Sequence, residues 1–146
     1  MEKKNILFLC TANSCRSQMA EGIMRHYLGS EYEVFSAGTI KTHVNETAKE
    51  VMSEIGYCMA GHHSKSIEEI HFLNFDYIIT VCNSAKESCP VLPKASKIYH
   101  WPFKDPASFF SNKKEDVLAE FRTVRDQIKR KILSHFHSKQ HYSQVL

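Results

Sequence analysis

Three residues near the start of the chain could together do chemistry on an oxyanion. Cys10 is followed six residues later by Arg16 and then by Ser17. A thiolate is a strong nucleophile, and the planar fork of a guanidinium matches two oxygens of a tetrahedral oxyanion. A serine hydroxyl beside the sulfur can donate a hydrogen bond that stabilises the thiolate further. The spacing therefore predicts a nucleophile aimed at the centre of a bound oxyanion.

The residues on either side of this motif predict how it is held. A short apolar run from Ile6 to Leu9 predicts a buried strand, and from Gln18 onward apolar residues recur at helical steps until Gly29. A loop that enters a helix directly presents backbone N–H groups and the positive end of the helix dipole. The residues expected to line this cradle are Thr11, Ala12, Asn13, Ser14, Cys15, Arg16 and Ser17. The alternative is that Cys10 is a small buried hydrophobe and Arg16 is solvated, but strand, spacing and helix agree on the anion site.

Two further cysteines follow the next apolar strand. Residues 75–82 are β-branched and aromatic, which predicts a central parallel strand ending at Cys82. Because ligands bind beyond the carboxyl ends of parallel strands, we expect the thiols of Cys82 and Cys10 to converge. Cys89 lies two helical turns later, which in a helix places the Cα atoms about 10 Å apart. A disulfide needs roughly 4.4–6.8 Å, so this pair requires unwinding. The alternative is that both are unrelated buried thiols.

An acidic residue is predicted to join the site from the far end of the chain. A fourth strand is expected over 97–101, and Asp105-Pro106 follows it. Proline stiffens the loop and disfavours helical geometry at Asp105, which can then hang over the pocket as a proton-transfer group. The alternative is an ordinary turn. Further helices are expected after Asn45 or Thr42 and over 113–137, where a basic run including Arg125 predicts a solvated face.

Composition limits the function classes. The 146 residues, with 42% hydrophobic and 24% charged, predict one soluble domain spanning 1–146. A net charge of +3 suits an anionic substrate but is too small for a nucleic-acid footprint. No apolar run is long enough for a membrane span or signal peptide, so we expect a cytoplasmic monomer. Five cysteines, without zinc spacings, argue against a disulfide framework and a metal site, and no cofactor is expected.

The motif from Cys10 to Ser17 resembles the phosphate-binding loop of the low-molecular-weight tyrosine phosphatase superfamily. The chain is more similar to the thioredoxin-coupled arsenate reductases built on that fold, through Cys82, Cys-Pro at 89–90 and His-Trp-x-Phe-x-Asp-Pro at 100–106. The resemblance covers residues 5 to about 136. It implies a three-layer α/β domain whose open sheet has four parallel strands in the order 2-1-3-4, flanked by helices.

The resemblance also implies an activity, namely reduction of arsenate to arsenite. Cys10 attacks arsenic, Asp105 handles the proton, and Cys82 then attacks the sulfur of Cys10. Cys89 takes over the disulfide, which a thioredoxin-like partner reduces. Two alternatives remain open: a phosphotyrosine or phosphomonoester hydrolase using Cys10, Arg16 and Asp105, or a thiol redox sensor without turnover.

Two positions depart from the family pattern. Position 12 is usually glycine, and a methyl at Ala12 costs about 1–2 kcal/mol if its φ must be positive. Some members hold a potassium ion with Asn13, Glu21, Ser36 and an acidic residue at the position of Lys65. Either that site is lost here, or the ammonium of Lys65 takes the place of the cation.

Overall fold

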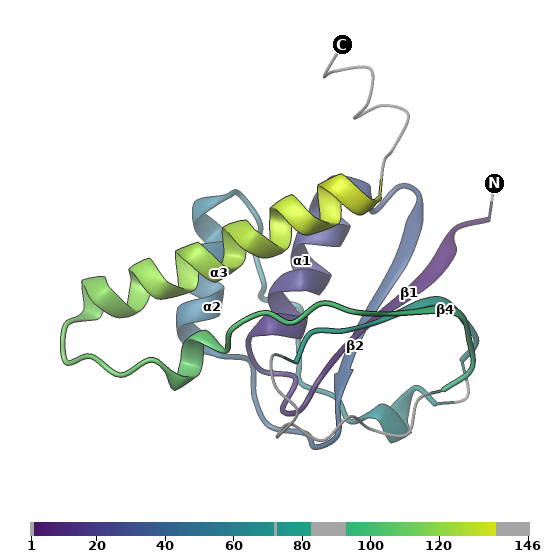
Figure 1. Cartoon of the computed structure of the whole chain (residues 1–146), viewed down its shortest axis with the longest axis horizontal. Helices are drawn as coiled ribbons and strands as arrows, with labels where there is room; N and C mark the ends of the chain where they lie inside the picture. The colour runs from purple at the N-terminus through teal and green to yellow at the C-terminus, as the bar shows by residue number, and fades with distance from the viewer. Residues whose placement is uncertain (1, 72, 83–92, 137–146) are drawn as a thin grey trace, which may run out of the picture.

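The computed structural model describes residues 2–71, 73–82 and 93–136. The elements, in chain order, are β1 (Lys4–Cys10), α1 (Arg16–Leu28), β2 (Tyr32–Gly38), α2 (Glu46–Glu54), η1 (Ile67–Glu69), β3 (Phe75–Thr80), β4 (Ala95–His100), η2 (Pro106–Ser108) and α3 (Lys114–His135). All neighbouring strands are parallel, and their order is β2-β1-β3-β4 (Figure 1). This confirms the predicted α/β class and strand order.

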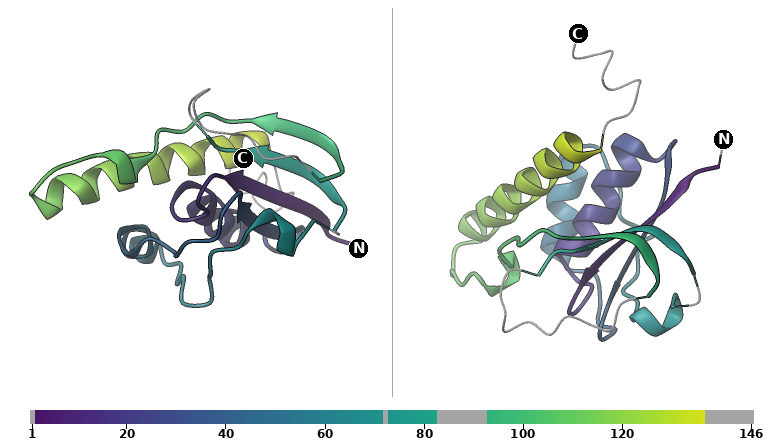
Figure 2. Two further views of the ribbon diagram at one scale, coloured as in Figure 1. Left: turned by 90° about the horizontal axis from the view of Figure 1, so that it is seen from below. Right: turned by 45° about the vertical axis from the view of Figure 1, so that its right-hand side comes forward.

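Alternation along β1 divides the core between the two faces of the sheet. Ile6 and Phe8 belong to the larger cluster, which they share with residues of α1, α2 and α3. Leu7 and Leu9 face the other way, into a smaller cluster that includes Ile70 beside η1. The three helices therefore cover one face and η1 with its flanks covers the other (Figure 2, right). Both faces of β1 are buried, so its end is held rigidly where Cys10 lies.

The predicted strand ends need small corrections. β3 ends at Thr80, so Cys82 lies two residues beyond the strand rather than at its last position. β4 covers Ala95–His100 and leaves Trp101 just outside, where it packs against Phe8 and Phe103 in the core. Ladder hydrogen bonds decide where a strand ends, and the amino-acid pattern does not encode them directly. Because β1 and β3 are parallel neighbours, their carboxyl ends still lie at the same edge of the sheet.

Helix boundaries follow their capping residues. Asn45 caps α2, because its side chain accepts a hydrogen bond from the Ala48 N–H at 3.0 Å. Gly56 follows this helix with φ of +86°, a conformation that favours glycine. α3 begins at Lys114, close to the expected residue 113. No helix in the described ranges is long and apolar enough to cross a membrane.

One residue of α3 contradicts its expected position on a solvated face. Arg125 is only 8% exposed. Its guanidinium donates to the carbonyl of Val51 at 2.8 Å and to the carboxylate of Glu54 at 2.7 Å. The basic face of α3 is therefore interrupted by a cation that ties the helix to α2.

Candidate active site

Cys10 ends β1 with its side chain buried and two hydrogen-bond contacts on its sulfur. The backbone N–H of Asn13 donates to Sγ at 3.1 Å, and the hydroxyl of Ser17 lies 2.8 Å from it. Asn13 Nδ2 donates to the same hydroxyl oxygen at 2.8 Å, which leaves the Ser17 proton available for the sulfur. The sulfur is thus held between a backbone donor and a hydroxyl, at the end of the strand and below the loop.

The loop between β1 and α1 is shaped by anchors on its carbonyl groups. Every carbonyl from residue 11 to 15 accepts a hydrogen bond: Thr11 from Thr39 and Ile40, Ala12 from Thr42 and Ser64, Asn13 from Gln18, Ser14 from Asn45, and Cys15 from Met19. Within a peptide plane the C=O and the following N–H point in opposite directions. Carbonyls turned outward therefore turn the next N–H groups inward, which makes an anion-binding concavity.

Two backbone details fix the path of this loop. Asn13 adopts φ of +50° and is the one non-glycine residue with positive φ in the described ranges, so the methyl of Ala12 brings no left-handed strain. Gly38 ends β2 opposite Cys10, and a Cβ there would lie 2.5 Å from the carbonyl oxygen of Thr11. Alanine at position 12 therefore carries none of the cost expected for a positive φ. The position that requires glycine is Gly38, on the neighbouring strand.

Arg16 reaches the pocket from the first position of α1. It is 5% exposed, and its Nη1 donates to the carbonyl of Phe103 at 3.2 Å and of Val81 at 3.5 Å. Its Nη2 lies 3.9 Å from a carboxylate oxygen of Asp105, whose side chain is 35% exposed. The other oxygen of Asp105 accepts from the Ala107 N–H at 3.0 Å, which caps η2. The guanidinium is oriented by the ends of two strands, with the carboxylate beside it.

A cavity of about 540 Å³ opens above the loop. Its lining residues are Cys10, Thr11, Ala12, Ser14, Cys15, Arg16, Thr42, His43, Asp105 and Ala107. The predicted site residues Asn13 and Ser17 lie beneath it, fully buried against the sulfur. Cys82 is buried in the same core cluster as Cys10. Cys89 lies outside the described residues.

Comparison with known proteins agrees with this geometry. Residues 5–142 match the family model described as low molecular weight phosphotyrosine protein phosphatase. The chain belongs to that family. Within the low molecular weight phosphotyrosine protein phosphatase family, it is 46% identical to arsenate reductase 2 of Staphylococcus saprophyticus, over 90% of this chain and 95% of that protein.

Solved structures of the family show the same fold. One, described as an arsenate reductase in the phosphate binding state, superposes with a TM-score of 0.73 and 31% identity, covering 88% of this chain and 93% of that one. Another, a thioredoxin-dependent arsenate reductase of Corynebacterium glutamicum, gives a TM-score of 0.60 and 25% identity, covering 92% of this chain and 64% of that one.

The second cysteine of the phosphatase-family loop has a different environment from the first. Burial raises the pKa of the Cys15 thiol to about 12, and the nearby charge of Asp105 acts in the same direction. Cys15 is thus a neutral thiol at physiological pH, and neutral thiols are poor nucleophiles. The loop thus places the sulfur of Cys10 beside hydrogen-bond donors, whereas burial keeps the thiol of Cys15 protonated.

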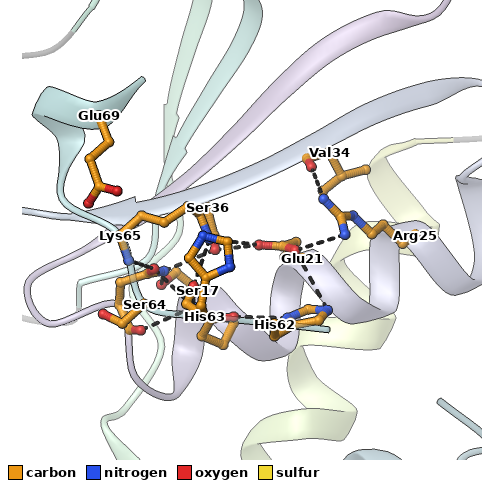
Figure 3. A network of polar contacts seen from close by, with 12 residues as sticks. Ser17, Glu21, Arg25, Val34, Ser36, His62, His63, Ser64, Lys65 and Glu69 are labelled. Carbon is orange, nitrogen blue, oxygen red and sulfur yellow. Dashed lines mark hydrogen bonds and ion pairs between the residues drawn. The ribbon is translucent and has the colours of Figure 1, made fainter. Parts of the chain in front are cut away.

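The residues around Glu21 do not fit the potassium ion that the resemblance implied. The ammonium of Lys65 lies 3.7 Å from the carboxylate, and the Ser36 hydroxyl donates to the same oxygen at 2.5 Å (Figure 3). A second cation at this oxygen would meet the charge of Lys65. Of the two possibilities, the geometry favours an internal ammonium in place of the ion.

Several supporting residues were not found from the sequence. Gln18 donates to the carbonyl and the side chain of Asn13, and its Oε1 lies 2.8 Å from His62 Nδ1. Because that oxygen can only accept, Nδ1 carries the proton and Nε2 accepts from the Tyr57 hydroxyl at 2.7 Å. Nothing in the local pattern marks these positions, since the partners are 44 residues apart.

The hydroxyl of Thr11 leads to a prediction. Among the side chains that the structure describes, its oxygen is the one buried polar atom without a hydrogen-bond partner, and the residue lines the cavity. We expect Thr11→Val to stabilise the free protein by about 1 kcal/mol, because an unsatisfied hydroxyl is removed. Binding of inorganic phosphate should weaken about tenfold, because a donor to the oxyanion is lost.

Thermal unfolding and calorimetric titration with phosphate measure the two effects of this substitution. Thr11→Ser, which keeps the hydroxyl, is the matched control and should bind phosphate as the wild type does. A destabilised Thr11→Val protein with unchanged phosphate affinity would contradict the assignment.

Proposed function

We propose that this chain reduces arsenate to arsenite through a relay of Cys10, Cys82 and Cys89, recycled by thioredoxin. The observation that carries the proposal is the Cys10 sulfur, which receives donors from Asn13 and Ser17 in a cavity that Arg16 and Asp105 also line. Similarity to arsenate reductases over most of the chain supports the choice of substrate. The thioredoxin-dependent relative supports the choice of reductant.

The first step forms a bond between sulfur and arsenic(V). The N–H groups of the loop and the guanidinium of Arg16 hold the arsenate oxygens, so the Cys10 thiolate meets the arsenic atom. As the S–As bond forms, one As–O bond breaks and its oxygen leaves as water or hydroxide. We assign delivery of the proton to Asp105, a role that its 3.9 Å distance from Arg16 and its partly exposed side chain support.

The second step is the reduction itself. The thiolate of Cys82 attacks the sulfur of Cys10, and a disulfide bond forms between them. The S–As bond breaks with its electron pair left on arsenic, which departs as arsenite in oxidation state III. Cys89 then attacks Cys82, so Cys10 is released as a thiolate and the new disulfide is reduced by the dithiol of thioredoxin.

Arsenite release in the presence of thioredoxin, thioredoxin reductase and NADPH tests this relay. We expect many turnovers for the wild type and about one per molecule for Cys89→Ser, because the disulfide then stays on Cys10 and Cys82 where the reductant cannot resolve it. Cys58→Ser, which changes an exposed cysteine, is the matched control and should turn over normally. A wild-type protein that releases no arsenite would refute the proposal.

The family description favours a second candidate, hydrolysis of phosphomonoesters. Cys10, Arg16 and Asp105 suffice for that chemistry, because a phosphoenzyme at Cys10 can be hydrolysed without further thiols. An aryl phosphate distinguishes the two functions. Turnover of it that is unchanged in Cys82→Ser and Cys89→Ser, in a protein inactive on arsenate, would establish a phosphatase.

A further inference from the structure

A carboxylate is buried within α1 beside a largely buried ammonium. The side chain of Glu21 is 3% exposed, and Lys65 Nζ lies 3.7 Å from its Oε1 while donating to the carbonyl of His63 at 2.8 Å. Arg25 contacts the other carboxylate oxygen at 3.2 Å, but its side chain is 45% exposed against 14% for Lys65. A buried charge is costly without a partner that is buried with it. Lys65 supplies that partner from a separate segment of the chain (Figure 3).

From Glu21 a line of hydrogen bonds runs to the nucleophile. The Ser36 hydroxyl donates to the carboxylate, which leaves the lone pairs of its oxygen for Asn13 Nδ2 at 3.0 Å. The other proton of that amide goes to the oxygen of Ser17 at 2.8 Å, and Ser17 contacts the sulfur of Cys10. The amide of Asn13 thus lies between the Glu21 carboxylate and the Cys10 sulfur. Because the carboxylate can only accept, it sets the direction of the hydrogen bonds that follow.

The backbone of the same lysine holds the other side of this amide. The N–H of Lys65 donates to Asn13 Oδ1 at 2.8 Å, and its carbonyl accepts from the N–H of Gly38 at 2.9 Å. Gln18 Nε2 donates to the same Oδ1 at 2.9 Å, so the orientation of the amide is fully determined. A displacement of residue 65 would therefore shift the side-chain amide of Asn13. That shift would change the hydrogen bond from Asn13 to Ser17 and, through it, the contact between Ser17 and the Cys10 sulfur.

We propose that Lys65 is a positioning residue for the nucleophile: its largely buried ammonium balances Glu21 and thereby fixes the donors that Asn13 and Ser17 present to the Cys10 sulfur. This inference rests on the proposed role of Cys10. Burial lowers the pKa of Lys65, while the carboxylates of Glu21 and, to a lesser extent, Glu69 act in the opposite direction.

The alkylation rate of Cys10 by iodoacetamide tests the inference without any arsenic chemistry. Peptide mass spectrometry at pH 7 follows the Cys10 peptide separately from the other cysteines. We expect Lys65→Met to slow its alkylation about tenfold, because a misaligned hydrogen bond no longer stabilises the charged sulfur. Lys65→Arg should restore most of the rate. Lys41→Met removes an exposed lysine that does not line the cavity above the loop and should leave the rate unchanged.

The background Glu21→Gln separates positioning from a general effect on the fold. If Lys65 acts through the carboxylate, adding Lys65→Met to Glu21→Gln should change the alkylation rate less than about twofold. Lys65→Met that lowers thermal stability yet leaves Cys10 alkylated at the wild-type rate would overturn the inference while leaving the proposed function intact. A wild-type Cys10 alkylated no faster than the exposed Cys58 would overturn both.

Discussion

Replacing Cys10 with serine is expected to lower arsenite formation by about 10⁴-fold or more, because removing the nucleophile from an assembled site leaves only binding and electrostatic effects. A serine hydroxyl is not ionised at neutral pH, and no group that the structure describes beside Cys10 is placed as a general base for it. The Asn13 N–H and the Ser17 hydroxyl are donors that stabilise a thiolate already formed. The chemistry therefore depends on sulfur and not merely on a nucleophile of similar shape.

Phosphate binding distinguishes this loss from a disordered loop. The carbonyl anchors of the loop do not involve the Cys10 side chain, so Cys10→Ser should still bind inorganic phosphate in a calorimetric titration. The melting temperature should stay close to that of the wild type. Arsenite formation by Cys10→Ser above the level without protein would contradict the assignment of the nucleophile.

The second large effect is expected at Arg16. Arg16→Lys keeps the charge but loses the planar fork, and we expect kcat/KM for arsenate to fall about 10²–10³-fold, as on loss of an oxyanion donor elsewhere. The lysine also cannot reproduce the contacts to the carbonyls of Val81 and Phe103, so the protein should be destabilised by about 1–2 kcal/mol. Steady-state arsenite release and urea unfolding measure the two losses.

Arg130→Lys is the matched control for the second prediction. Arg130 is exposed on α3, away from the loop, and its replacement should change neither quantity. An Arg16→Lys protein with wild-type kcat/KM would show that charge alone suffices at this position. In that case the fork geometry would be irrelevant to the substrate.

Patterns that are local in the sequence predicted most of the fold. The spacing from Cys10 to Arg16 located the loop, because the residues that bind and attack the oxyanion are consecutive there. The apolar run from Ile6 to Leu9 lies within β1, because a continuous apolar stretch marks a strand that is buried on both faces. β3 and β4 were each displaced by about two residues at one or both ends, where hydrogen bonding outweighs side-chain pattern.

Features that depend on distant partners could not be predicted. The burial of Arg125 requires Val51 and Glu54, more than 70 residues away, so a basic run was taken for a solvated face. From the sequence, an ammonium of Lys65 in place of a potassium ion was only one of two possibilities. The structure shows that this ammonium lies beside the carboxylate of Glu21. The relation of Cys82 and Cys89 to Cys10 stays a prediction.

The anchoring of the loop carbonyls also bears on how the protein assembles. The hydrogen bonds from Thr39, Thr42 and Ser64 join residues that are 28, 30 and 52 positions apart in the chain. Contacts between residues far apart in the chain form only at the entropic cost of closing the intervening loop. The strand, loop and helix that carry Cys10 precede these three partners in the chain, so the oxyanion cradle is complete only when the segments around residues 39–42 and 64 have packed against the loop. The backbone geometry around the Cys10 sulfur is therefore a product of tertiary folding and not of the local sequence alone.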